Sequence, residues 1–212
     1  LGFERRKGPS ILLATLYYRS TTDAITTLAV DLGDGVLLAQ RANAGERQNA
    51  GLELVKAGKL NAKLTYNLSA NLYWSRIRSP NLGFNADRSG TTGFGRANLN
   101  WQVTPKDFVQ LNLFANGKTF YPQGYGAPTA SGNIGWRHKV NDTVSWMLVA
   151  QDPFDTLRNK LVLDAPDGTI RRRARFNSQV FTFTIIQTFG GGRTRDPNFD
   201  FAPGGNAGAG AL

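Results

Sequence analysis

Residues 62–76, AKLTYNLSANLYWSR, alternate between apolar and polar side chains. A period of two is that of a β-strand, because successive side chains of a strand point to opposite faces of its sheet. One face of this strand carries only apolar or aromatic residues: Leu64, Tyr66, Leu68, Ala70, Leu72 and Trp74. The other face is almost entirely polar, so the strand separates two different environments.

The same alternation recurs along the chain and predicts nine strands. They are expected over residues 1–6, 10–31, 36–58, 62–76, 91–104, 107–118, 128–140, 143–152 and 175–189. Short turns (7–9, 59–61, 105–106 and 141–142) alternate with longer connections (78–90, 121–127 and 153–174), and LGDG at 32–35 is a short exception among the latter. We therefore predict an all-β fold, an antiparallel up-and-down meander with short turns at one end and long loops at the other.

The composition limits the chemistry of the chain. Its 212 residues include no cysteine, which excludes disulfides and thiolate metal sites. The net charge of +10 is compatible with nucleic acid, anionic lipid or an acidic ligand as a partner. No apolar run is long enough for a transmembrane helix, and neither an initial Met nor a signal peptide is present, so we expect a mature or truncated part of a longer product.

Two features favour a transmembrane barrel over a soluble β-sandwich, whose strands would also alternate. The apolar faces are rich in Leu, Ala, Gly and Val, which suits lipid, while the polar faces repeat Asn, Thr, Gln, Ser and Arg. The contrast between short turns and long loops is typical of outer-membrane barrels, which have short periplasmic turns and longer extracellular loops. The apolar face would then contact lipid and the polar face a lumen.

Aromatic side chains on the apolar faces lie at similar heights. Tyr66, Trp101, Trp136 and Trp146 are each four or five residues from a short turn, and Trp74 is near the opposite margin. At about 3.3 Å per residue, the first four would form a ring at the short-turn end. Such an aromatic girdle is expected at a membrane interface. The alternative is that aromatic residues simply favour strands.

An odd number of strands indicates a partial barrel. An antiparallel sheet in lipid must close, since each unpaired amide at an edge costs several kcal/mol. Bacterial single-chain barrels have even strand numbers. We therefore predict that residues 1–189 are the C-terminal part of a larger barrel, and that the Gly-, Pro- and Ala-rich residues 190–212 are a flexible tail.

Four segments resemble TonB-dependent outer-membrane receptors, and more narrowly their outer-membrane beta-barrel subgroup. They are ANAGERQNAGLELVKAGKL (42–60), GRANLNWQVTPKDFVQLN (95–112), GNIGWRHKVNDTVSWMLVAQDPFDT (132–156) and FTFTIIQTFGGG (181–192). The segment from Asp152 to Thr156 is similar to the Asn-Leu-Phe-Asp break after the penultimate strand, with Asp and Pro replacing Asn and Leu. The resemblance implies that the chain supplies the last nine strands of a 22-stranded transporter barrel with a plugged lumen.

The resemblance also implies a function and partners. The family imports scarce nutrients, such as siderophores, vitamins or oligosaccharides, with energy that the TonB complex delivers through an N-terminal plug. The plug and the remaining strands are expected partners outside this chain. A C-terminal strand ending in an aromatic residue is read by the barrel assembly machinery in this family, and the matching positions here are Phe181, Phe183 and Phe189.

Charged residues supply candidate contacts. The strand pattern places Glu53, Arg96 and Arg137 on lumen-facing positions, where they are candidates for contact with plug or substrate; the alternative is an ordinary hydrated side chain. The basic run RRRAR at 171–175 is a candidate for contact with anionic lipopolysaccharide, or else a solvated loop.

No catalytic, cofactor or metal site is predicted, and we do not expect an enzyme. His138 is the only histidine and lies on the lipid-side register beside the turn at 141–142, where a solvated interfacial side chain is expected. Turn chemistry explains the aspartates of DLGDG (31–35) and DAPDG (164–168) better than calcium does. Without an aromatic-basic platform, nucleic-acid binding is not expected. The alternatives to a receptor segment are a small self-contained outer-membrane pore or adhesin, and a soluble all-β binding domain.

Overall fold

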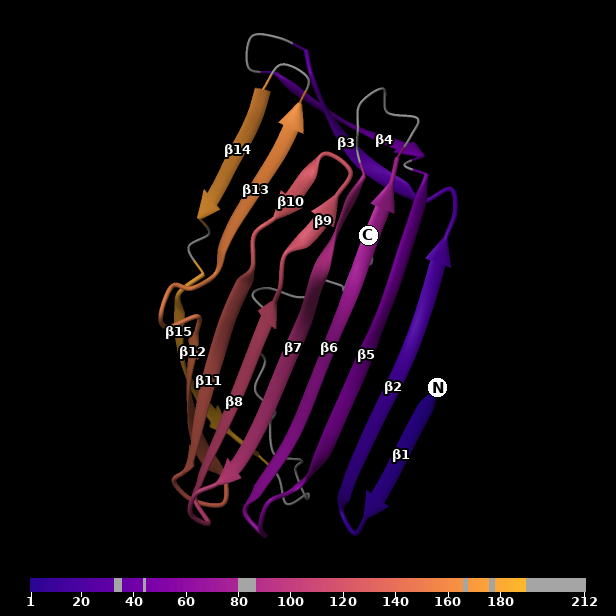
Figure 1. The fold of residues 1–212 in the computed structure, drawn as a ribbon. Coiled ribbons are helices and arrows are strands. Elements are labelled where there is room, and N and C mark those ends of the chain that lie inside the picture. The colour runs from indigo at the N-terminus through magenta and orange to yellow at the C-terminus, as the bar shows by residue number, and fades with distance from the viewer. Residues whose placement is uncertain (33–35, 44, 80–86, 166–167, 176–177, 190–212) are drawn as a thin grey trace.

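The computed structural model describes residues 1–32, 36–43, 45–79, 87–165, 168–175 and 178–189. Nine strands form one antiparallel sheet in chain order, as Figure 1 shows. Their bounds are β1 (Gly2–Lys7), β2 (Ser10–Thr21), β5 (Glu46–Lys59), β6 (Leu64–Arg78), β7 (Arg88–Gln102), β8 (Asp107–Asn116), β11 (Thr129–Lys139), β12 (Val144–Gln151) and β15 (Val180–Gln187). The predicted nine-stranded antiparallel meander is thus confirmed.

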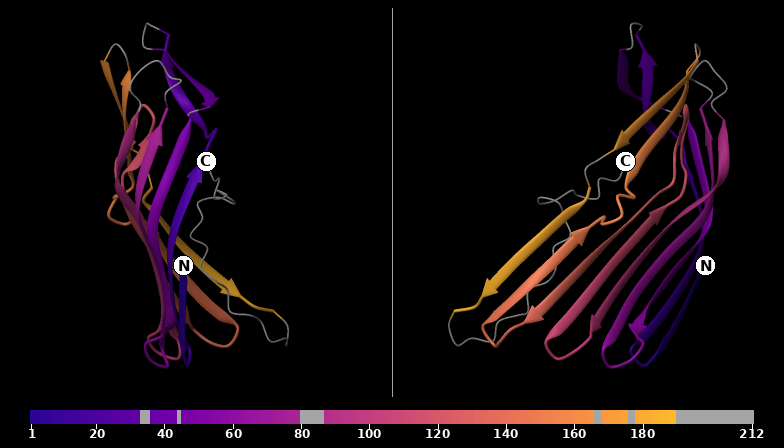
Figure 2. Two further views of the ribbon diagram at one scale, coloured as in Figure 1. Left: turned by 45° about the vertical axis from the view of Figure 1, so that its right-hand side comes forward. Right: turned by 90° about the vertical axis from the view of Figure 1, so that its left-hand side faces the viewer.

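The sheet is open within the described part of the chain. Strands β1 and β15 are its two edges, each paired on one side only, and Figure 2 shows them at opposite ends of a curved wall. The described residues contain no helix, and so none that could cross a membrane.

The register gives the sheet two faces of different composition. Directly opposed residues of an antiparallel pair share a face. Leu68 opposes Ala97 on what we call the apolar face, and the adjacent Asn67 opposes Asn98 on what we call the polar face. No described part of the chain covers the apolar face: Leu72 is 63% exposed and Ile185 is 67% exposed. A soluble sandwich would bury these side chains, so the exposed apolar face argues against that alternative.

The polar face is less uniform than its sequence pattern indicates. An asparagine row crosses four neighbouring strands, and its members are Asn67, Asn98, Asn112 and Asn133. Nearer the short turns, however, Met147 and Val149 of β12 are buried on this face and pack against Phe108 and Ile186. The polar face therefore combines hydrated rows with a small apolar cluster.

Three of the four short turns share the same pattern of side-chain hydrogen bonds. The side-chain oxygens of Asn61, Thr104 and Asn141 each accept hydrogen bonds from the backbone N–H groups two and three residues further on, at 2.8–3.1 Å. Asn and Thr favour turns because their side chains can replace a backbone acceptor in this way. The predicted short-turn end is therefore specified by local sequence.

The first long connection differs from its prediction. The pattern predicts single strands over 10–31 and 36–58, but β2 ends at Thr21 and β5 begins at Glu46. Between them, β3 (Ile25–Asp31) and β4 (Leu37–Asn43) form a separate hairpin. LGDG is thus no short turn of the main sheet, although residues 33–35 themselves lie outside the described residues. Alternation continues through both halves of each segment, so it cannot mark where the chain leaves one sheet for another.

Two predicted loops, 121–127 and 153–174, also contain strands. β9 (Thr119–Tyr121), β10 (Gly124–Gly126), β13 (Arg158–Ala165) and β14 (Gly168–Arg175) form a four-stranded sheet in the order β14-β13-β10-β9. In Figure 1 this sheet lies at the same end of the molecule as β3 and β4. The long connections therefore gather at one end, as predicted, but they do so as ordered strands.

The last strand is shorter than predicted. β15 ends at Gln187, so Phe189 lies beyond the strand that it was expected to end, and it is 82% exposed. The Thr188 N–H still donates to the Thr143 carbonyl at 2.8 Å. Pairing stops there because the neighbouring chain turns away at Asn141–Thr143. The predicted tail, 190–212, lies outside the described residues.

Candidate functional site

A pocket of about 360 Å³ lies on the polar face, at the end where the long connections gather. Strands β6, β7 and β8 form one wall, and β9, β10 and the start of β13 contribute another. Four of its lining residues are aromatic, namely Tyr73, Phe94, Phe114 and Tyr121. Concave sites of this kind are the usual binding sites for small molecules.

A glycine allows the pocket to form. The Gly117 N–H donates to the Gly93 carbonyl at 2.6 Å, which holds the corner between β8 and β9 against β7. A Cβ at position 117 would lie 2.6 Å from Thr92 Oγ1 and 2.9 Å from the Gly93 oxygen, both too close for a real contact. Only glycine permits this close approach, and the approach brings Tyr121 over the same pocket as Phe114.

Asp152 organises the connection after β12. It is 3% exposed, and its carboxylate accepts hydrogen bonds from Thr156 N–H and Oγ1, from Leu157 N–H and from Ser178 Oγ. Burial alone would raise the pKa of this carboxyl, but the hydrogen bonds from Ser178, Thr156 and Leu157 outweigh it and hold the pKa well below its ordinary range. Because Leu157 lines the pocket, Asp152 ties the pocket wall to the end of β12.

The same residue explains the motif at Asp152–Thr156. Asp152 and Asp155 have φ angles of 40° and 51°, a left-handed conformation that Asp tolerates better than most residues. The Asp152 N–H also donates to the Gly132 carbonyl at 3.0 Å, which anchors the corner on β11. The motif is therefore a corner that turns the chain out of the main sheet.

The three predicted lumen residues all lie on the polar face, in different places. Arg96 is directly opposite Phe114 and so adjoins the pocket. Glu53 is opposite Asn71, and the guanidinium of Arg137 lies 5.2 Å from the ring centre of Phe108, far along the sheet from the pocket. Contact of any of the three with plug or substrate stays a prediction.

The predicted girdle residues lie on the apolar face, and several of them touch. Trp136 and Trp146 pack edge to face with ring centres 4.6 Å apart, and Trp146 lies 6.1 Å from Phe183. Tyr66, Trp101 and Trp74 share the face by register, Trp74 at the far margin. Their anchoring role stays a prediction, and it is the role that exposed aromatic residues have at the margins of membrane barrels.

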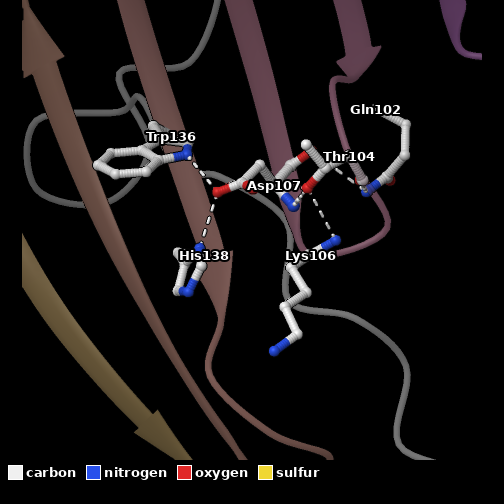
Figure 3. A network of polar contacts seen from close by, with 6 residues as sticks. All are labelled: Gln102, Thr104, Lys106, Asp107, Trp136 and His138. Atoms are coloured by element: carbon white, nitrogen blue, oxygen red, sulfur yellow. Dashed lines mark hydrogen bonds and ion pairs between the residues drawn. The ribbon is translucent and has the colours of Figure 1, made fainter.

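A polar network supports this cluster, as Figure 3 shows. Asp107 Oδ1 accepts a hydrogen bond from Trp136 Nε1 at 3.2 Å and lies 2.7 Å from His138 Nδ1, while its other oxygen accepts from Thr104 Oγ1. His138 lies on the apolar face beside the turn, as predicted, but it is half-buried and paired rather than freely solvated. Sequence alone gives no signal for this network, because only the register brings β8 and β11 together.

The predicted barrel-assembly positions are exposed on the last strand. Phe181 and Phe183 oppose Ala150 and Leu148 on the apolar face, whereas Phe189 follows the strand. Their recognition by an assembly machinery stays a prediction.

The basic run at 171–175 belongs to β14, not to a loop. Arg171, Arg172 and Arg173 are exposed, and Arg173 is directly opposite Lys160 on β13. Like charges in a cross-strand pair repel each other, so an anion beside them would stabilise the hairpin. Contact with lipopolysaccharide stays a prediction.

Comparison with known proteins identifies the fold family. The model of the outer membrane protein beta-barrel family matches residues 1–186. The chain belongs to this family. Among solved structures, the Ralstonia pickettii toluene transporter TbuX is similar at 13% sequence identity and a TM-score of 0.34, over 87% of this chain and 63% of that chain. The chain thus spans less than two thirds of that structure's length. No curated protein sequence matches this chain.

Family membership gives the two faces their environments. An outer membrane beta-barrel is a protein of the bacterial outer membrane, and its outward face is an apolar band in contact with lipid. By analogy with such barrels, we expect lipid on the apolar face and the barrel interior on the polar face, and we call them the lipid face and the interior face. In such barrels the short turns face the periplasm and the longer connections face the outside, so we expect the pocket on the extracellular side. Among the described residues, no group of three His, Asp or Glu lies close enough together to hold a metal ion.

Proposed function

We propose that this chain is the C-terminal barrel segment of a TonB-dependent receptor that imports a scarce nutrient across the outer membrane. The observation that carries the proposal is the open sheet, whose edges β1 and β15 are each paired on one side only. In lipid, unpaired edge amides cost several kcal/mol each. The sheet is therefore completed by further strands, and a barrel much larger than nine strands has room for a plug.

The interior face supports transport rather than catalysis. It carries the asparagine row, which suits a hydrated lumen, and a pocket that faces the extracellular side. The wall formed by this chain would bind the nutrient, a siderophore, a vitamin or an oligosaccharide, while the plug in another part of the protein would receive the pull of the TonB complex. No catalytic residue and no cofactor enter this proposal.

The proposed partners follow from the same geometry. Outer-membrane lipid would cover the apolar face, lipopolysaccharide would neutralise the arginines of β14, and the assembly machinery would read Phe181 and Phe183. The plug or the substrate would contact Glu53, Arg96 and Arg137 from inside the barrel.

The first test is the size and energy requirement of the mature protein. An antibody against this chain would detect the mature protein on a blot of outer membranes from the source bacterium. Uptake of siderophores, vitamins and oligosaccharides would be measured in cells limited for iron, vitamins or polysaccharides. We expect a band several times larger than this chain, and uptake that stops when the gene for TonB is deleted. A mature product of about 212 residues, or uptake that is independent of TonB, would instead establish a small pore or adhesin whose sheet closes between copies.

A further inference from the structure

We propose that the pocket on the polar face is a subsite for one polyhydroxylated ring, that is, a single sugar unit of a carbohydrate substrate. The inference rests on the proposed import function and chooses among its substrate classes. Its basis is the combination of size, lining and charge in one pocket formed by strands that are far apart in the sequence.

The size of the pocket selects one ring. Its volume of about 360 Å³ is near the lower end of the ~300–1,000 Å³ typical of small-molecule sites. A complete siderophore complex or a corrinoid vitamin would not fit inside it. A chain of sugar units would place one unit in the pocket and leave the others in the lumen.

The aromatic walls suit a ring with apolar faces. Tyr73, Phe94 and Phe114 come from three adjacent strands of the main sheet, and Tyr121 comes from β9 on the other wall. Aromatic rings offer flat apolar surfaces with a negative face. The C–H groups on the face of a sugar ring carry partial positive charge, so they pack favourably on such a surface.

The polar side chains that line the pocket favour a sugar over a hydrocarbon as its ligand. Besides the two tyrosines, six lining residues carry hydrogen-bonding side chains, namely Thr92, Asn116, Thr119, Thr129, Arg158 and Asn159. Within the part of the chain that the structure describes, none of these side chains has a hydrogen-bond partner. An apolar ligand would strip water from them and leave them unpaired, whereas hydroxyl groups both donate and accept and can therefore satisfy them.

The charge of the lining argues against a polyanionic ligand. Among the described residues that line the pocket, Arg158 is the only charged one, and the nearby Arg96 lies outside the lining, opposite Phe114. By register, Lys160, Arg171 and Arg173 share the face of Arg158, and Arg172 shares that of Asn159, but none of these four cations is among the residues that line the pocket. A neutral or singly charged sugar matches this lining better than a highly charged chelate.

The test is a binding experiment on the purified full-length protein in detergent. The probes are a glycan array of short oligosaccharides, with toluene and benzoate as competitors. Tyr121→Ala and Asn159→Ala alter the pocket, while Leu68→Ala on the apolar face and Asn67→Ala on the polar face outside the pocket are matched controls. A difference in gel migration between unheated and heated samples shows whether each variant is folded, and Tyr121→Leu, which also removes the aromatic ring, replaces Tyr121→Ala if that variant does not fold.

We expect at least one glycan to bind and the two pocket variants to weaken it by about tenfold or more, with controls unchanged. Retained binding in Tyr121→Phe would agree with a role for the ring face. The inference is overturned if no glycan binds, if the pocket variants bind glycans as the wild type does, or if only toluene or benzoate binds there. Because the assay needs neither a plug movement nor TonB, glycan binding without TonB-dependent uptake would refute the proposed import function and leave the subsite standing.

Discussion

The two faces of the nine-stranded sheet are built differently. On the lipid face, large apolar side chains such as Leu72 and Ile185 are exposed, and no described segment of the chain covers them. On the interior face, the chain folds over itself: β9, β10 and β13 cover part of the wall, and Asp152 is buried within a set of hydrogen bonds. Alternation in the sequence specifies the first face almost completely, and the second face only in part.

The difference follows from the medium that each face contacts. Lipid accepts any apolar side chain of suitable length, so a lipid face needs only the right pattern. A site in the interior must bring particular groups to particular distances, which requires contacts between segments distant in sequence. The pocket joins residues from 73 to 159, and no local pattern links them.

The largest expected effect comes from placing one charge on each face at adjacent positions of β8. Leu111 is on the lipid face, opposite Leu99 and Ile134, and Gln110 is on the interior face. Leu111→Arg should cost about 2–4 kcal/mol, as for a cation near the bilayer midplane, while Gln110→Arg should be tolerated. Urea unfolding of the protein in lipid vesicles measures both. Equal losses would mean that the two faces do not meet different environments.

The next effect concerns the cover of the interior face. Asp152→Ala removes the acceptor of four hydrogen bonds and leaves buried donors unpaired, so we expect a loss of about 1–3 kcal/mol or more. Because its pKa is lowered in the fold, the stabilisation by Asp152 is complete at neutral pH and is lost as the pH falls below about 4. Thermal unfolding at several pH values checks this. In Asp152→Asn this part of the acid sensitivity should disappear, and its persistence would contradict the assignment.

A smaller effect is expected from the aromatic cluster of the lipid face. Trp146→Leu keeps an apolar side chain but removes the edge-to-face contact with Trp136. Such contacts contribute about 0.5–1.5 kcal/mol beyond area burial, and the unfolding free energy in vesicles should fall by that amount. Trp101→Leu is the comparison variant, since Trp101 makes no ring contact with another described residue. A larger loss in Trp101→Leu would show that interface anchoring, rather than the ring pair, dominates.

The smallest effect is expected at a periplasmic turn that belongs to neither face. A hydrogen bond and the charge of Lys139 lower the pKa of Asp142, yet the side chain of Asp142 is almost fully exposed. Water and salt screen such pairs. Asp142→Asn should therefore leave the thermal midpoint unchanged at both low and high salt. A salt-dependent shift would mean that the turn is less hydrated than its exposure indicates.

Much of the fold was predictable because its signals are local. Residues close in sequence specify the alternation of β6 and the lipid-side position of His138. They also specify the turn hydrogen bonds accepted by Asn61, Thr104 and Asn141. The β3–β4 hairpin and the strands β13 and β14 were not predicted, because alternation is the same whichever sheet a strand joins. The Asp107 network was missed for a related reason, since Trp136 and His138 reach it only across a strand pair.

The candidate site shows the same division. The alternation of side chains along its strand was enough to predict Arg96 on the interior face. Nothing in the sequence indicated that Phe114 would lie beside Arg96, or that Tyr121 would line the same pocket as Phe114. By itself, the sequence determined an antiparallel meander with one face for lipid and one for a lumen, because a period of two and local turn chemistry need only neighbouring residues. Only the tertiary structure decided where the long connections return and which side chains meet in the pocket, because those contacts depend on register between distant strands and on the close approach that Gly117 permits.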